Sequence, residues 1–159
     1  MILLDELQAW CLQRGAASWR PSPAQVEQLV KRVAEAQRDT GVQLAWAADL
    51  TTLGAVSVEL LEERLGRELA ALARLLAVAV PAVGERPKSP EVYWRLIARS
   101  PPSVKLVACC RWLVYQRADA GDRPTLAPRW QDTVQGMAQP WPKLLAELAE
   151  FSAGEAHSR

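Results

Sequence analysis

The sequence predicts an all-α fold, a single-domain bundle of seven or eight helices. Apolar residues recur at spacings of three and four along most of the chain, as on one face of a helix. Strand signals are scarce, because the chain has two tyrosines, one phenylalanine and no asparagine for a tight hairpin turn. Its 159 residues, half of them apolar, suit one domain that buries about 70% of its extended surface.

The first 41 residues predict two helices. An apolar stripe over residues 3–11 forms the first helix, which Gly15 is expected to end. Ser22 and Pro23 begin the second, because serine caps a helix and proline fits its first position. Gly41 is expected to end this second helix.

The strongest helical pattern covers residues 43–80, where Gly54 is expected to separate a short helix from a long one that Pro81 ends. Five leucines run down one side of the long helix: Leu61, Leu65, Leu69, Leu72 and Leu76. Acidic residues lie on or near the other side, so the stripe is interpreted as core, with a seam between copies as the alternative.

Serine–proline pairs predict the next helix starts, at Ser89-Pro90 and Ser100-Pro101. The second pair opens a helix over about residues 104–119, closed by Gly121. Two short helices then start near Pro128 and Pro142. We assign residues 1–153 to the helical domain and residues 154–159 to a polar C-terminal tail.

The residue types needed for catalysis or metal binding are sparse. The single histidine, His157, lies in the polar tail, which leaves little basis for a histidine-dependent active site. Cys11, Cys109 and Cys110 lack the spacing of a chelating set, and the scattered glycines form no phosphate-binding loop. The sequence therefore predicts a protein that is not an enzyme and that uses no metal and no cofactor.

Two observations predict a cytoplasmic protein without a membrane anchor. Asp5 and Glu6 lie where a signal peptide would carry basic residues. The longest uncharged apolar stretch, residues 75–84, is far shorter than the roughly 20 residues of a membrane span.

The net charge of +1 conceals a basic segment over residues 86–130, where nine basic residues face three acidic ones. On a helical projection of residues 104–119, an apolar stripe forms one side and cations with aromatic rings form the other. The sequence predicts a solvent-facing binding surface formed by eight residues: Arg86, Lys88, Arg95, Arg99, Lys105, Arg111, Trp112 and Tyr115.

Arginine and flat aromatic rings suit phosphate contacts and base stacking, which favours nucleic acid as the partner. Two alternatives stay open. The basic face can be purely structural, with Trp112 packed against a second neighbouring helix, or it can meet an acidic protein partner.

The chain has seven tryptophans, more than a core of this size usually needs. Three of them, Trp10, Trp46 and Trp130, fit apolar stripes and are expected in the core. The other four are candidates for exposed interface anchors: Trp19, Trp94, Trp112 and Trp141.

Two segments, about a quarter of the chain, resemble the small subunits of Class 1 CRISPR effector complexes. The first is RLIARS at residues 95–100, followed by a helix through RWLV at 111–114. The second is WPKLLAEL at residues 141–148, similar to a closing helix of the pattern W-x-x-L-L-x-x-L. The resemblance implies a subunit present in several copies beside neighbouring effector subunits, contacting the crRNA–target backbone without reading sequence.

The sequence thus predicts a non-catalytic helical subunit of an RNA-guided ribonucleoprotein complex, which contacts crRNA or target nucleic acid through its basic face. The alternative is a helical adaptor or inhibitor, for example phage- or plasmid-encoded, that uses the same face on an acidic protein partner.

Overall fold

The computed structural model describes residues 4–13, 22–52, 57–77, 90–117 and 128–157. Within these ranges every regular element is a helix and there is no strand, which confirms the all-α prediction. The described part contains nine helices rather than seven or eight. They are α1 (Leu4–Gln13), α2 (Pro23–Val33), α3 (Arg38–Thr52), α4 (Val58–Leu65), α5 (Arg67–Ala77), α6 (Pro90–Ala98), α7 (Pro102–Arg117), α8 (Pro128–Met137) and α9 (Pro142–His157).

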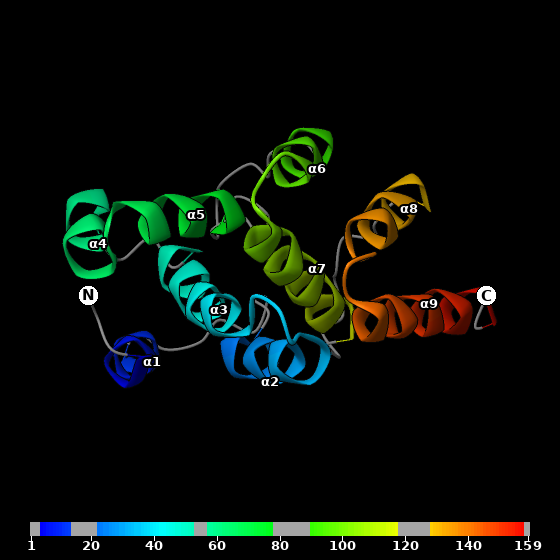
Figure 1. The fold of residues 1–159 in the computed structure, drawn as a ribbon, viewed down its shortest axis with the longest axis horizontal. Helices are drawn as coiled ribbons and strands as arrows, with labels where there is room; N and C mark the ends of the chain where they lie inside the picture. Colours follow the sequence, from blue (N-terminus) through cyan, green and yellow to red (C-terminus); the bar gives the residue numbers. More distant parts are fainter. Residues whose placement is uncertain (1–3, 14–21, 53–56, 78–89, 118–127, 158–159) are drawn as a thin grey trace.

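Helix α7 lies in the middle of the arrangement (Figure 1). It contacts α2, α3 and α5 from the first half of the chain, and α6 and α8 from the second. Its large apolar side chains, Leu106 and Leu113 among them, are fully buried in the hydrophobic core. The position of α7 therefore determines which residues of the basic segment reach solvent.

The predicted start of α2 is confirmed. Pro23 occupies its first turn, and the Ser22 hydroxyl accepts a hydrogen bond from the Gln25 amide at 3.4 Å. The same kind of cap begins α4, where the Ser57 hydroxyl accepts from the Leu60 amide at 3.2 Å. Serine side chains thus satisfy backbone amides that the first turn of a helix leaves without intrahelical partners.

Gly41 does not end α2, and this prediction is wrong. Helix α2 ends at Val33, and Gly41 lies inside α3. A Cβ atom on Gly41 would lie 3.0 Å from Val30 Cγ1 and 3.2 Å from Leu106 Cδ2. Glycine therefore allows α3 to lie close to α2 and α7 here, because an added Cβ would require the Val30 and Leu106 side chains to shift by a few tenths of an ångström.

The long helix expected after Gly54 is broken at Gly66, which separates α4 from α5. Gly66 has a φ of 83°, a left-handed conformation that favours glycine, and its amide donates to the Glu62 carbonyl at 2.9 Å. Gly54 and Pro81, the expected ends, lie outside the described residues. The leucine stripe is nevertheless core: Leu61, Leu65 and Leu76 are buried, and Leu69 and Leu72 are partly buried and pack against the hydrophobic core.

Prolines begin the four C-terminal helices, at Pro90, Pro102, Pro128 and Pro142. Helix α7 starts two residues earlier than the expected position 104 and ends at Arg117, while the expected end at Gly121 lies outside the described residues. Helix α9 continues to His157, so the first four residues of the expected polar tail are helical. None of the helices described here is long and apolar enough to cross a membrane.

Candidate nucleic-acid interface

The corner between α6 and α7 exposes two of the predicted cations. Helix α6 buries Tyr93, Trp94 and Ile97, which leaves Arg95 on the exposed side. Arg99 is also exposed and follows the last residue of α6. Since the two arginines are four positions apart, they lie one turn apart on the same side.

Hydrogen bonds to carbonyl groups of the last turn of α6 fix the backbone at Arg99 and Ser100. The Arg99 amide donates to the Leu96 carbonyl at 3.2 Å, and the Ser100 amide donates to the Ile97 carbonyl at 3.0 Å. The Ser100 hydroxyl also donates to the Leu96 carbonyl at 2.7 Å. These bonds continue the helical path beyond Ala98, so the Arg95–Arg99 spacing is preserved into the turn.

Lys105 lies in the first turn of α7 and is half-buried. Its amide donates to the Pro101 carbonyl at 3.3 Å. Within the described residues, the side chains of Arg95, Arg99 and Lys105 form no ion pair and no hydrogen bond. We call these three residues the α6–α7 corner. They are the predicted site residues whose described side chains are at least partly accessible to solvent.

The predicted solvent exposure of Arg111 and Trp112 is wrong. Arg111 is only 4% exposed and Trp112 only 9% exposed. The helical projection assumed one buried face, but α7 has neighbours on several sides, so its second face is buried as well. The Trp112 ring packs edge-on against Phe151 of α9, with 5.7 Å between ring centroids and an interplanar angle of 87°.

The buried Arg111 lies near the aromatic side of α6. Burial raises the pKa of the Tyr93 phenol above its ordinary value of 10.0, and the Arg111 charge partly opposes this shift. The Tyr93 ring packs edge-on against Trp94, with 4.9 Å between centroids. Arg111 therefore belongs to the polar part of the core between α6 and α7, not to the surface.

Three predicted site residues fall outside this description: Arg86 and Lys88 entirely, and the side chain of Tyr115. The anchor role expected of the tryptophans is also largely wrong, because Trp94 and Trp141 are buried like Trp112. Trp46 is buried as predicted. Trp19 and the side chains of the remaining two tryptophans, Trp10 and Trp130, lie outside the described part.

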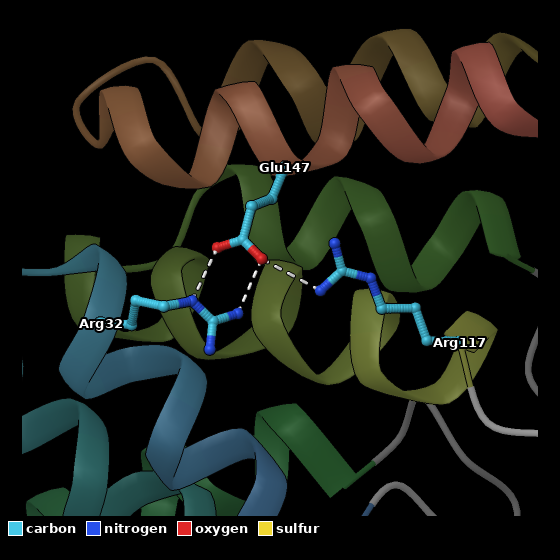
Figure 2. A network of polar contacts seen from close by, with 3 residues as sticks. All are labelled: Arg32, Arg117 and Glu147. Atoms are coloured by element: carbon cyan, nitrogen blue, oxygen red, sulfur yellow. Dashed lines mark hydrogen bonds and ion pairs between the residues drawn. The ribbon is translucent and has the colours of Figure 1, made fainter.

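The sequence interpretation missed a three-residue charged network, the Arg32–Glu147–Arg117 network (Figure 2). Arg32 of α2 donates through Nη2 to Glu147 Oε1 at 2.7 Å and through Nε to Oε2 at 3.2 Å. Arg117 of α7 donates through Nη1 to the same Oε1 at 3.1 Å. The network joins α2, α7 and α9, and no short-range sequence pattern could have revealed it, because Arg32 and Glu147 are 115 positions apart.

The two guanidinium groups change the acidity of the carboxyl group between them. Partial burial alone would raise the pKa of Glu147. The hydrogen bonds from Arg32 and Arg117 outweigh that effect, so the pKa of Glu147 lies below its ordinary value of 4.5. Glu147 is therefore ionised at neutral pH and compensates one of the two positive charges.

The three cysteines are buried core residues. The Cys11 thiol donates to the Trp46 carbonyl at 3.2 Å, and the Cys109 thiol donates to the Val134 carbonyl at 3.7 Å. Burial raises the pKa of Cys109 to about 12 and that of Cys110 well above 9.0, so neither is a reactive thiolate at neutral pH. Among the described residues, no group of three or more histidine, cysteine or acidic side chains could hold a metal ion.

Comparisons with protein-family models, with curated proteins and with solved structures give no significant match to this chain.

Proposed function

We propose that this chain is a non-catalytic helical subunit of an RNA-guided ribonucleoprotein complex of the Class 1 CRISPR type, and that it contacts the nucleic-acid backbone through the α6–α7 corner. The observation that supports this proposal most directly is the positive charge of the corner. Arg95, Arg99 and Lys105 are at least partly accessible. No acidic residue occurs from position 92 to position 118.

The chemistry of these side chains suits phosphate groups. An arginine guanidinium presents a planar set of N–H donors that matches two phosphate oxygens, and lysine adds a mobile point charge. Because Trp112 is buried, we assign no base-stacking role to it, and the proposed contact is with the backbone alone. Such a contact is independent of sequence and strongly dependent on salt.

The α4–α5 surface provides a matched control for this proposal. Arg64, Arg67 and Arg74 are also exposed, so their replacement changes the net charge by the same amount. In contrast to the α6–α7 corner, they share their helices with several acidic residues, including Glu63 and Glu68. A general effect of net charge would therefore appear in both sets of variants.

The test compares R95E/R99E/K105E with R64E/R67E/R74E in salt-titrated binding to single-stranded RNA and to an RNA–DNA duplex. The protein is assayed alone and within its assembled complex. We expect the first variant to lose binding and the second to retain most of it. Neutralising one corner cation should reduce the slope of log K against log salt by about 0.7–0.9.

Both triple variants should keep the fold, because all the replaced residues except the half-buried Lys105 are exposed, and exposed charges usually change stability by less than about 1 kcal/mol each. Thermal melts check this point. If R95E/R99E/K105E folds and binds like the wild type, the proposal is wrong.

A second candidate is a helical adaptor or inhibitor that binds an acidic protein partner. One observation favours it: Leu96, between Arg95 and Arg99 in sequence, is a large apolar side chain that is 40% exposed. Apolar contacts contribute to protein interfaces and add little to phosphate contacts. Leu96→Ser should therefore leave nucleic-acid binding unchanged, whereas it should weaken a complex with a protein partner at this corner.

A further inference from the structure

A second cluster of cations lies at the other end of α7, where Arg117 ends the helix and Arg32 lies in the last turn of α2. Both guanidinium groups point at Glu147 (Figure 2). Glu147 Oε1 accepts from Arg32 Nη2 at 2.7 Å and from Arg117 Nη1 at 3.1 Å. Two guanidinium groups from different helices thus meet at one oxygen atom.

The network has an uncompensated positive charge and is open to solvent. Two arginines face one carboxylate, and no other acidic side chain of the described residues pairs with either arginine. The side chains of Arg32 and Arg117 are 55% and 40% exposed. Arg117 donates only through Nη1, and Arg32 only through Nε and Nη2, so N–H donors remain on both groups that no described residue accepts.

We propose that Arg32 and Arg117 form a phosphate-binding site. Without phosphate, the Glu147 carboxylate occupies the position that a phosphate group takes when it binds. A phosphate group offers more oxygen atoms and more charge than a carboxylate, so each guanidinium can bind its own oxygen. The site is separate from the α6–α7 corner, because Lys105 and Arg117 are twelve residues apart, about 18 Å along the axis of α7. The proposal holds whether or not that corner binds nucleic acid.

Helix α9 can stay in place while the Glu147 side chain leaves the arginines. Leu144 and Leu148, on either side of Glu147 in sequence, are buried and fix the backbone of α9. The Glu147 side chain is 20% exposed and has a path to solvent. In the proposed exchange the Glu147 side chain rotates towards solvent while α9 keeps its place.

The first test measures inorganic phosphate binding by calorimetry at constant ionic strength for the wild type, Glu147→Gln and Glu150→Gln. Glu150 is the matched control, because it is exposed on the same helix and forms no ion pair with a described residue. In the wild type, Glu147 competes for the arginines within the molecule. We therefore expect Glu147→Gln to bind phosphate about tenfold more tightly than the wild type and Glu150→Gln.

Adding Arg117→Gln to Glu147→Gln should abolish the gain. A thermal melt checks that Glu147→Gln is folded. If the folded variant binds phosphate no better than Glu150→Gln, the proposal is overturned and the network only joins helices.

A short oligonucleotide without a terminal phosphate forms the second arm of the experiment. Tighter binding of this oligonucleotide to Glu147→Gln than to Glu150→Gln, which has the same α6–α7 corner and the same net charge, supports a phosphodiester ligand. A gain for inorganic phosphate alone supports a free phosphate ion.

A measurement on the wild type makes the test independent of any effect of Glu147→Gln on folding. In a phosphate titration followed by NMR at constant ionic strength, the Nε–Hε signals of Arg32 and Arg117 should shift. The signal of Arg74, exposed on α5, is the internal reference. Equal shifts of all three signals, or no shift, overturn the proposal.

Discussion

Helices α5 and α7 differ in how they meet the rest of the protein. Helix α5 buries Ala70, Ala73 and Leu76 on one side and exposes Arg67 and Arg74 on the other. Helix α7 packs against α2, α3, α5, α6 and α8 and also contacts α9 through Trp112 and Arg117, and nearly all of its described side chains are buried or half-buried. A helix at the edge of the protein has one buried face and one exposed face. A helix at the centre is buried on all sides along most of its length.

Whether a charged residue of a helix reaches solvent therefore depends on the number of helices packed around it. On α5, the side chains of both arginines, Arg67 and Arg74, are exposed to solvent. On α7, Arg111 is buried between helices, and only the two ends of the helix bring cations to the surface, at Lys105 and Arg117. The middle of α7 therefore belongs to the core, and the two sites proposed above lie at its ends.

The largest expected effect is the loss of a buried aromatic side chain from the middle of α7. Trp112→Ala should lower the free energy of unfolding by about 3–5 kcal/mol, because it removes a packed ring and leaves a cavity beside Phe151. Arg74→Ala on α5 should change it by no more than about 0.5 kcal/mol. Urea unfolding measures both, and similar values for the two variants would contradict the comparison.

Replacing two helical glycines by alanine should change the free energy of unfolding by a medium amount, with opposite signs at the two positions. One glycine, Gly41, lies beside α7, and the other, Gly136, lies at the edge of the protein. Gly41→Ala should destabilise the protein by about 1–3 kcal/mol, since its Cβ would press against Val30 and Leu106. At Gly136 of α8, nothing lies within 4 Å of the added Cβ, so Gly136→Ala should stabilise by about 0.5–1 kcal/mol. Thermal melts decide the sign, and stabilisation by Gly41→Ala would contradict the close approach of α3 to α2 and α7.

The smallest effect concerns the exposed end of α7 and depends on pH. The pKa of Glu147 is lower in the folded protein than its ordinary value of 4.5. The network therefore stabilises the fold above that pH, and this contribution is lost as the pH falls through the folded-state pKa. Because both arginines are largely exposed, we expect a contribution below about 1 kcal/mol.

The measurement is the difference in unfolding free energy between the wild type and Glu147→Gln, at pH 7 and at acidic pH below 4.5. The difference should favour the wild type at pH 7 and shrink on acidification. Glu150→Gln serves as the reference for the general effect of losing one carboxylate. A difference that grows towards acidic pH would show that the sign is wrong.

The features of the fold that could be predicted from the sequence depend on residues close together in the chain. The Ser22 cap, the prolines that begin helices and the leucines on α4 and α5 depend on neighbouring residues, so spacing alone reveals them. The break at Gly66 was missed because a leucine stripe passes over it without losing its spacing.

The candidate site was harder to predict because it depends on tertiary neighbours. Arg95 and Arg99 are exposed as predicted, since α6 has one buried face. The positions of Arg111 and Trp112 depend on how many helices surround α7, which their own spacing does not encode. Glu147 could not be connected with Arg32 from sequence, because nothing local relates two side chains 115 positions apart.

The distance in sequence between Arg32 and Glu147 also has a consequence during synthesis of the chain. At a translation rate of about 5–20 residues per second, the 115 positions between them correspond to roughly 6–23 s. During this time the part of α9 that carries the ion-pair partner of Arg32 has not been made. In a growing chain the Arg32 side of α2 therefore lacks its contact with α9 for seconds.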